Sequence, residues 1–140
     1  HEVRRLIRDM SADKIIIVST HILEEVDALC TRAMIIAHGR LLIDDTPAGL
    51  MQRSRYHNAV TLTLDDLETA ASRLGELPES REVEVRRGQL TVFPSSQGDL
   101  FEAVTATIQR EGWEVHQLQL EPGRLDEVFR SVTRKDEEAA

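Results

Sequence analysis

The 140-residue sequence is poor in aromatic residues and in cysteine. Aromatic side chains make up only 4% of the chain, so aliphatic side chains must form its core. The single cysteine, Cys30, cannot form an internal disulfide, which indicates a reducing compartment. No apolar stretch approaches the roughly 20 residues of a membrane-spanning helix, and no signal-peptide pattern is present. We therefore expect neither a disulfide-stabilised secreted domain nor direct membrane insertion.

Basic residues are outnumbered by acidic ones. Lysine and arginine total 17 against 25 aspartates and glutamates, giving a formal net charge of −8. A nucleic-acid-binding surface, or one attracted to anionic lipids, requires a basic face. Nucleic acid is therefore not an expected partner. The hydrophobic fraction of 41% is ordinary for a globular chain.

The motifs of a complete nucleotide or metal site are also missing. No G-x-x-x-x-G-K-[ST] phosphate-binding loop occurs anywhere in the sequence. The remaining histidines do not form a metal-ligand spacing with Cys30, so no metal site is expected; they are His1, His38, His57 and His116.

The most informative stretch joins an apolar run to a helical pattern. The run from Lys14 to Val18 is apolar and β-branched after the lysine, which predicts a strand buried on both faces, as in a parallel sheet. Ser19 and Thr20 follow as residues that cap helices. His21 is therefore expected at the carboxyl end of a buried strand and at the mouth of a helix. Ligands bind at that position in open α/β sheets.

His21 is the leading candidate for chemistry. A near-neutral imidazole donates one hydrogen bond, accepts another, and can gain charge when a phosphate approaches. The alternative is a capping or surface histidine without a role. Ser19 and Thr20 are interpreted as structural caps. The adjacent Glu24 and Glu25 point about 100° apart on a helix, so they favour its N-terminus rather than forming a catalytic pair.

The first part of the chain has too few elements for a core of its own. A parallel strand at 14–18 needs parallel neighbours, and the sequence offers none. Because the chain also opens mid-pattern without an initiator methionine, we expect it to be a fragment. The pattern predicts helices over 1–12, 21–31 and 47–53, and a hairpin of 33–37 with 41–43 around His38 and Gly39.

A second pattern begins after a polar boundary at 54–58. The predicted strands are 60–64, 82–86, 90–92 and 113–120, and the predicted helices are 65–77 and 99–111. This β-α-β-β-α-β order over 59–120 is that of the ferredoxin-like split βαβ fold. A slip in apolar phase between Val115 and Leu118 predicts a bulge or an edge strand. A last helix from about Leu125 is expected as an extra element, followed by a disordered charged tail at 135–140.

Several short motifs together resemble the end of an ABC-type ATPase subunit. They are Ser19–Val26 (STHILEEV), Cys30–Arg32, Ile35–Ile36, Gly39–Arg40 and Thr46–Leu50. The resemblance implies that His21 is the switch (H-loop) histidine, a catalytic residue that contacts the ATP γ-phosphate. It also implies that the phosphate-binding loop, the signature motif and the Mg²⁺-binding strand lie before His1. ATP and Mg²⁺ would then be cofactors of the intact subunit, whereas this chain alone would be inactive.

The same resemblance implies an α/β fold in two domains. Residues 1–55 would be the tail of a P-loop ATPase domain, and 56–140 a ferredoxin-like accessory domain like those of exporter and gliding-motility ATPases, which end in segments like Leu125–Phe129. The implied partners are a transmembrane permease and a second copy of the subunit, at the cytoplasmic face of the cell membrane. The alternative is a non-enzymatic regulatory, dimerisation or ligand-sensing module. No residue identifies the transported substrate.

Overall fold

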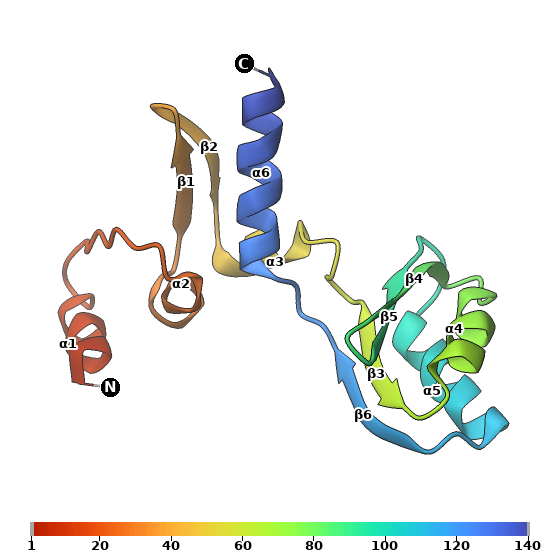
Figure 1. Ribbon diagram of the computed structural model, residues 1–140. Coiled ribbons are helices and arrows are strands. Elements are labelled where there is room, and N and C mark those ends of the chain that lie inside the picture. Colours follow the sequence, from red (N-terminus) through yellow and green to blue (C-terminus); the bar gives the residue numbers. More distant parts are fainter. Residues whose placement is uncertain (1, 140) are drawn as a thin grey trace. The chain divides into compact units, whose positions relative to one another are not determined.

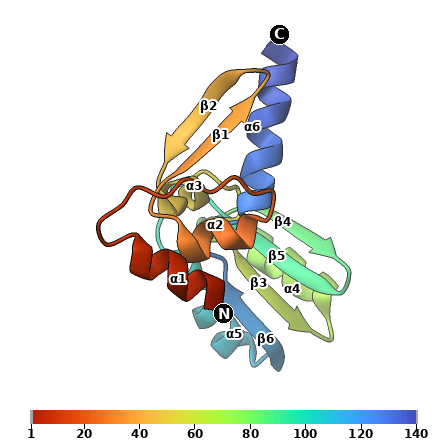
Figure 2. The same ribbon diagram turned by 90° about the vertical axis from the view of Figure 1, so that its left-hand side faces the viewer.

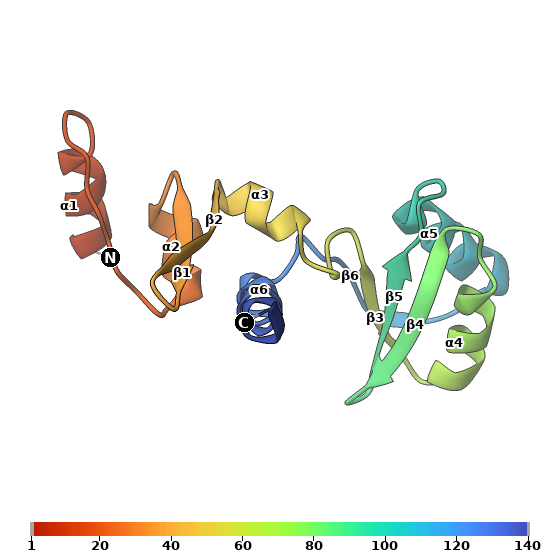
Figure 3. The same cartoon turned by 90° about the horizontal axis from the view of Figure 1, so that it is seen from above.

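The computed structural model describes residues 2–139 and divides the chain into two compact units (Figures 1, 2 and 3). The first unit combines the residues up to Met51 with those from Leu125 onward, and the second spans Gln52–Arg124. The second unit is therefore inserted into the sequence of the first. Among the described residues, no helix combines the length and the apolar character needed to cross a membrane.

The first unit is built on a β-hairpin. Strands β1 (Ala33–Ala37) and β2 (Arg40–Asp45) pair antiparallel, which confirms the predicted hairpin. Its two turn residues, His38 and Gly39, both have positive φ, as tight hairpin turns require. The helices of this unit are α1 (Glu2–Met10), α2 (Leu23–Leu29), α3 (Pro47–Gln52) and α6 (Leu125–Ala139).

The predicted strand at 14–18 is absent. Residues 15–20 have no regular secondary structure, and the side chains of Ile15 and Ile17 are 95% and 85% exposed. The prediction was wrong for this chain because a strand needs a neighbour for its backbone N–H and C=O groups. Within residues 2–139 the sheets contain only the six labelled strands, and none of them pairs with this segment.

The second unit has the predicted order of elements. It comprises β3 (Val60–Leu64), α4 (Leu67–Gly75), β4 (Ser80–Arg86), β5 (Gln89–Pro94), α5 (Leu100–Glu111) and β6 (Val115–Leu120). The strands form one sheet in the order β4-β5-β3-β6, with every pair antiparallel. Leu64 pairs with Val115 and Thr63 with Gln117, so His116 is the extra residue of a bulge. The predicted bulge is thereby confirmed.

Alternation along the strands separates an apolar from a polar face. Helices α4 and α5 lie together on one face of this sheet (Figure 3). Strand residues on that face form the core with residues of both helices, whereas Thr61 and Thr91 face the opposite side. The buried cluster consists of Val60, Leu62, Leu64, Ala70, Leu74, Leu90, Val92, Leu100 and Val104. All of these side chains are aliphatic, but the expectation of an aliphatic core holds only for this cluster, because Phe93 of β5 is also fully buried.

Helix α6 differs from its expected place and length. The sequence assigned it to the 56–140 domain with a disordered tail, but in the structure it packs against β1 and β2 and stays helical through Ala139. Its last turns are held by an ion pair between Asp136 and Arg40 of β2. A packing partner distant in sequence thus orders a charged segment that looks disordered in isolation. Ala140 lies outside the described residues.

Candidate functional site

The turn before α2 positions His21. The Thr20 hydroxyl accepts a hydrogen bond from the Ile22 amide at 3.0 Å and donates one to Glu25 Oε2, also at 3.0 Å. Thr20 therefore braces the turn ahead of the helix. It is not the predicted cap, because Ile22 is the N-cap of α2 and no side chain caps that helix. Because Glu25 accepts this hydrogen bond, its carboxylate helps to stabilise the turn.

The His21 side chain projects from this turn into solvent. It is exposed, and its ring makes no hydrogen bond to the part of the chain that the structure describes. The ring is thus free to receive a ligand on either nitrogen. Its role as a nucleotide contact stays a prediction.

Large apolar side chains are exposed on both sides of His21. Before it, Ile15, Ile17 and Val18 are exposed, and after it Ile22 is 43% exposed. Further exposed apolar residues of the first unit lie on α1 and on the hairpin: Val3, Leu6, Met10, Met34, Ile36 and Leu41. Exposed apolar sets of this size are typical of surfaces that contact another protein, a membrane or a ligand.

Helix α1 is tied to α2 by an arginine. Arg8 Nη2 donates to the carbonyl oxygen of Ala28 at 3.1 Å, near the C-terminal end of α2. Cations are favoured at that end, where carbonyl groups lack helical partners. Arg8 is not among the residues that the sequence singles out, so this role was missed. Finding it required knowledge of which helices pack together.

The other histidines that the structure describes are dispersed. His38 lies in the β1–β2 turn, His57 Nδ1 contacts the Pro122 carbonyl oxygen at 2.9 Å, and His116 Nε2 contacts Asp65 Oδ1 at 2.9 Å. Over residues 2–139 no three His, Cys, Asp or Glu side chains converge as metal ligands. His1 lies outside the described residues.

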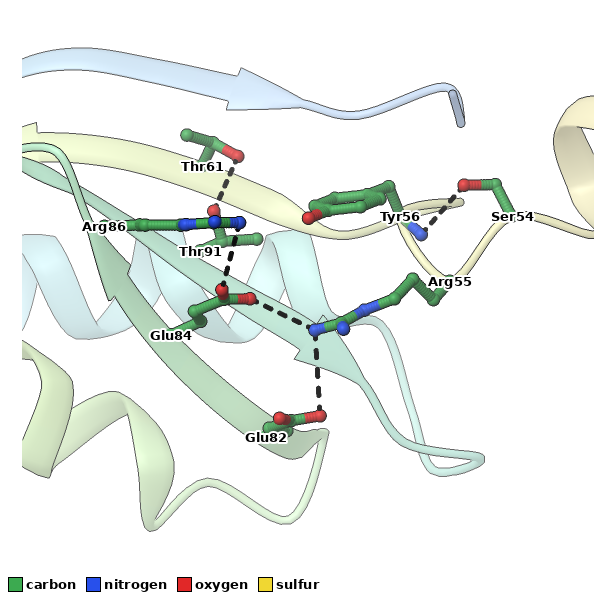
Figure 4. Close-up of polar contacts among 8 residues, drawn as sticks. All are labelled: Ser54, Arg55, Tyr56, Thr61, Glu82, Glu84, Arg86 and Thr91. Atoms are coloured by element: carbon green, nitrogen blue, oxygen red, sulfur yellow. Dashed lines mark hydrogen bonds and ion pairs between the residues drawn. The ribbon is translucent and has the colours of Figure 1, made fainter. Parts of the chain in front are cut away.

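A stacked polar cluster that the sequence did not predict covers one end of the second unit's sheet. The Arg55 guanidinium lies 4.1 Å from the ring centroid of buried Phe93 and 3.1 Å from Glu84 Oε2. Arg124 lies 3.8 Å over the Tyr56 ring. Figure 4 shows Arg55 reaching from the linker, residues 53–59 between α3 and β3, toward Glu82 and Glu84 on β4. These contacts hold the linker on the sheet.

The segments where the chain enters and leaves the second unit, near Ser54 and Arg124, are joined by hydrogen bonds. Ser54 Oγ accepts hydrogen bonds from the backbone amides of Tyr56 and Arg124, each at 3.1 Å. Glu121 Oε1 accepts from Thr61 and from Arg124, each at 3.0 Å. These residues are structural, and no local signal in the sequence distinguishes them from an ordinary polar boundary.

Among residues 2–139, the pKa values of three side chains are shifted. The hydrogen bond to Asp65 raises the pKa of His116 above its usual range, and the negative charge of Asp65 adds to the effect. The Thr69 hydroxyl lowers the pKa of Asp66, the N-cap of α4. Asp44 raises the pKa of Arg32. None of these groups lies at the His21 turn.

The chain is similar to a curated ATP-binding protein. It is 26% identical over 127 residues to the Nod factor export ATP-binding protein I of Sinorhizobium fredii (strain NBRC 101917 / NGR234). The match covers 91% of this chain and 35% of that protein, so the chain spans about a third of the relative's length. No family model matches the chain. The similarity supports a distant relationship to that ATP-binding protein.

Proposed function

We propose that this chain is part of the ATP-binding, ATP-hydrolysing subunit of an ABC-type membrane exporter, and that His21 contacts the ATP γ-phosphate there. The observation that carries the proposal is the segment before His21. An apolar, β-branched run with two isoleucines more than four-fifths exposed leads directly into an exposed imidazole.

The exposed run fits a strand that has lost its neighbours. Strands of parallel sheets are covered on both faces and read as continuous Val and Ile runs. Were residues 14–18 inserted between parallel strands, Ile15 and Ile17 would be buried and His21 would stand at the carboxyl edge of the sheet. Similarity to an export ATP-binding protein along 91% of the chain agrees with this placement.

The imidazole suits contact with a terminal phosphate. Phosphoryl transfer depends mainly on positioning and on electrostatic stabilisation, so a donor held at the γ-phosphate assists it. Thr20 and Glu25 would fix the turn that aims the ring. The chain's own residues fit this single contact and do not fit Mg²⁺ binding, because Glu25 is bound to Thr20 and no phosphate-binding loop is present. Other parts of the intact subunit would hold the nucleotide and the metal.

The intact subunit would act as a pair of copies bound to a transmembrane permease at the cytoplasmic face of the cell membrane. The exposed apolar residues of α1, of 15–22 and of the hairpin would be covered by the remainder of the ATPase domain. The export direction rests on the similarity to the Nod factor exporter protein.

The test is ATP hydrolysis by the full-length polypeptide that contains this chain. His21→Ala should lower kcat by about 100-fold or more, the order expected for losing one transition-state donor, while ATP binding is largely kept. His38→Ala, at an exposed hairpin turn, is the matched control and should retain activity. Unchanged hydrolysis in His21→Ala would overturn the proposal.

The 140-residue chain by itself should neither bind nor hydrolyse ATP. The reason is that it offers a single phosphate contact and no cradle for the triphosphate. Titration calorimetry with ATP and Mg²⁺ should give no binding heat. Hydrolysis by the purified chain that His21→Ala abolishes would show that the nucleotide site is complete without further sequence.

A second candidate function concerns residues 52–124 alone. Because this unit has its own core and sheet, it fits a regulatory, dimerisation or ligand-sensing module of the same subunit. Ser54 and Arg124 are hydrogen-bonded neighbours, so residues between them can be replaced by a short flexible linker. In the full-length subunit this replacement should leave ATP binding intact while weakening dimerisation. An unchanged dimer constant would remove the dimerisation role.

A further inference from the structure

Strand β6 is an open sheet edge without charged side chains. It terminates the order β4-β5-β3-β6 and, over residues 2–139, pairs with β3 alone (Figure 1). Its sequence, VHQLQL, contains no Asp, Glu, Lys or Arg. Unprotected edges of this kind are templates for pairing with another strand.

The opposite edge of the same sheet is protected in the usual way. Strand β4 carries four charged side chains, and Arg55 from the linker forms ion pairs with two of them. The charged residues are Arg81, Glu82, Glu84 and Arg86. Charges on an edge strand prevent unwanted pairing. The β6 edge lacks this protection by charge.

The backbone pattern identifies which groups of β6 face outward. The Glu121 amide donates to the Ala59 carbonyl oxygen at 2.8 Å, so the backbone of Glu121 faces β3. Because this direction alternates along an antiparallel pair, Gln119 also faces β3, whereas the N–H and C=O groups of Leu118 and Leu120 face the open edge. The side chains of these two leucines are 38% and 47% exposed.

We propose that β6 pairs antiparallel with β6 of a second copy of this chain, about a two-fold axis at Gln119, joining the two sheets into one. In this register Leu118 of each copy lies opposite Leu120 of the other. Each leucine pair exchanges both backbone hydrogen bonds, and four half-exposed leucine side chains meet on one face. The two Gln119 side chains meet on the polar face.

A second copy suits this edge better than an unrelated peptide. A two-fold axis sets Gln119 against its own counterpart, so a fixed charge at that position would face a like charge. Strand β6 carries none, and His116 would lie opposite Pro122, away from its own counterpart. Pro122 lacks an N–H and ends the pairing where the chain leaves the sheet. The pairing uses no residue of the first unit, so it stands apart from the ATP chemistry proposed for His21.

A single cysteine at the axis tests this register. In the full chain carrying Cys30→Ser, Gln119→Cys should form an intermolecular disulfide under mild oxidation. The two Cα atoms at such a non-hydrogen-bonded pair lie about 4.5 Å apart, within the range a disulfide spans. Gln117→Cys is the matched control, since its exposed side chain lies on the same face of β6. In this register it is displaced from its counterpart by about 14 Å along the strand.

The expected result is a covalent dimer for Gln119→Cys and a monomer for Gln117→Cys on a non-reducing gel. Sedimentation over a concentration series should show a reversible dimer of the unmodified chain that Leu120→Lys shifts toward monomer by tenfold or more. Equal cross-linking of both cysteine variants, or none by either, would overturn the proposal. An unmodified chain that stays monomeric at every concentration would also overturn the proposal, and would leave the β6 edge to an unrelated peptide.

Discussion

At the scale of single residues, His116 shows how a bulge creates a contact. The sequence predicted the bulge because the apolar phase slips between Val115 and Leu118. It could not predict that the extra residue turns its ring to Asp65, 51 positions earlier. That contact depends on the register of β6 against β3, and register is set by the whole sheet.

The His116–Asp65 pair should be visible as a pH-dependent contact. Asp65 raises the pKa of His116 in the folded chain, so Asp65→Asn should lower it toward the ordinary histidine value. Glu114 acts on the same ring only through its charge, so Glu114→Gln should lower the pKa less. Ring NMR during a pH titration measures both shifts. An unmoved His116 resonance in Asp65→Asn would contradict the hydrogen bond.

The sign of the linked stability effect follows from the raised pKa. The folded chain holds the His116 proton more tightly than the unfolded chain does. The pair therefore stabilises the fold below the unfolded pKa of about 6.5, and this contribution disappears as pH rises through the higher folded value. Both side chains are largely exposed, so the effect on stability is small.

At the scale of elements, the sequence pattern predicted the helices, turns and strands whose formation depends on nearby residues. The helices at 65–77 and 99–111, the strand at 60–64 and the turn at His38 all formed where the pattern placed them, with small shifts at their ends. The strand predicted at 14–18 did not form, although its residues have the strongest strand propensity in the chain. Propensity supplies no partner for backbone hydrogen bonds, and pairing decides whether a strand exists.

The α5 cap provides a prediction at this scale. The Asp99 carboxylate accepts a hydrogen bond from the Glu102 amide at 3.1 Å, satisfying one of the free donors of the first turn. Asp99→Ala should lower the free energy of unfolding by about 1 kcal/mol. Urea denaturation followed by the fluorescence of Trp113, the sole tryptophan, measures it. Glu111→Ala, exposed at the far end of α5, serves as the control and should change stability much less.

At the scale of the molecule, the division of the chain could be predicted only in part. The polar boundary at 54–58 marked the entry into the second unit, whose limits in the structure are Gln52 and Arg124. The return crossing and the packing of α6 on the hairpin were missed. An amphipathic helix exposes one apolar face in its sequence, but the sequence does not state which distant surface will cover that face.

Only part of the candidate site could be predicted from the local sequence. The Thr20 turn and the exposed imidazole of His21 follow from a short stretch of chain. The bracing of α1 by Arg8, and the apolar surface around the site, depend on contacts between elements. The role of His21 therefore has to be measured on the polypeptide that carries the whole ATPase domain.

The most direct measurement is the ring NMR spectrum of His21 in the full-length subunit, recorded with ADP and with a non-hydrolysable ATP analogue. The two nucleotides differ by the γ-phosphate group, which is the group His21 is proposed to contact. We expect the His21 ring resonances to shift with the analogue and to stay near their nucleotide-free positions with ADP, while His38 responds to neither. Identical His21 spectra in the two complexes would contradict the account.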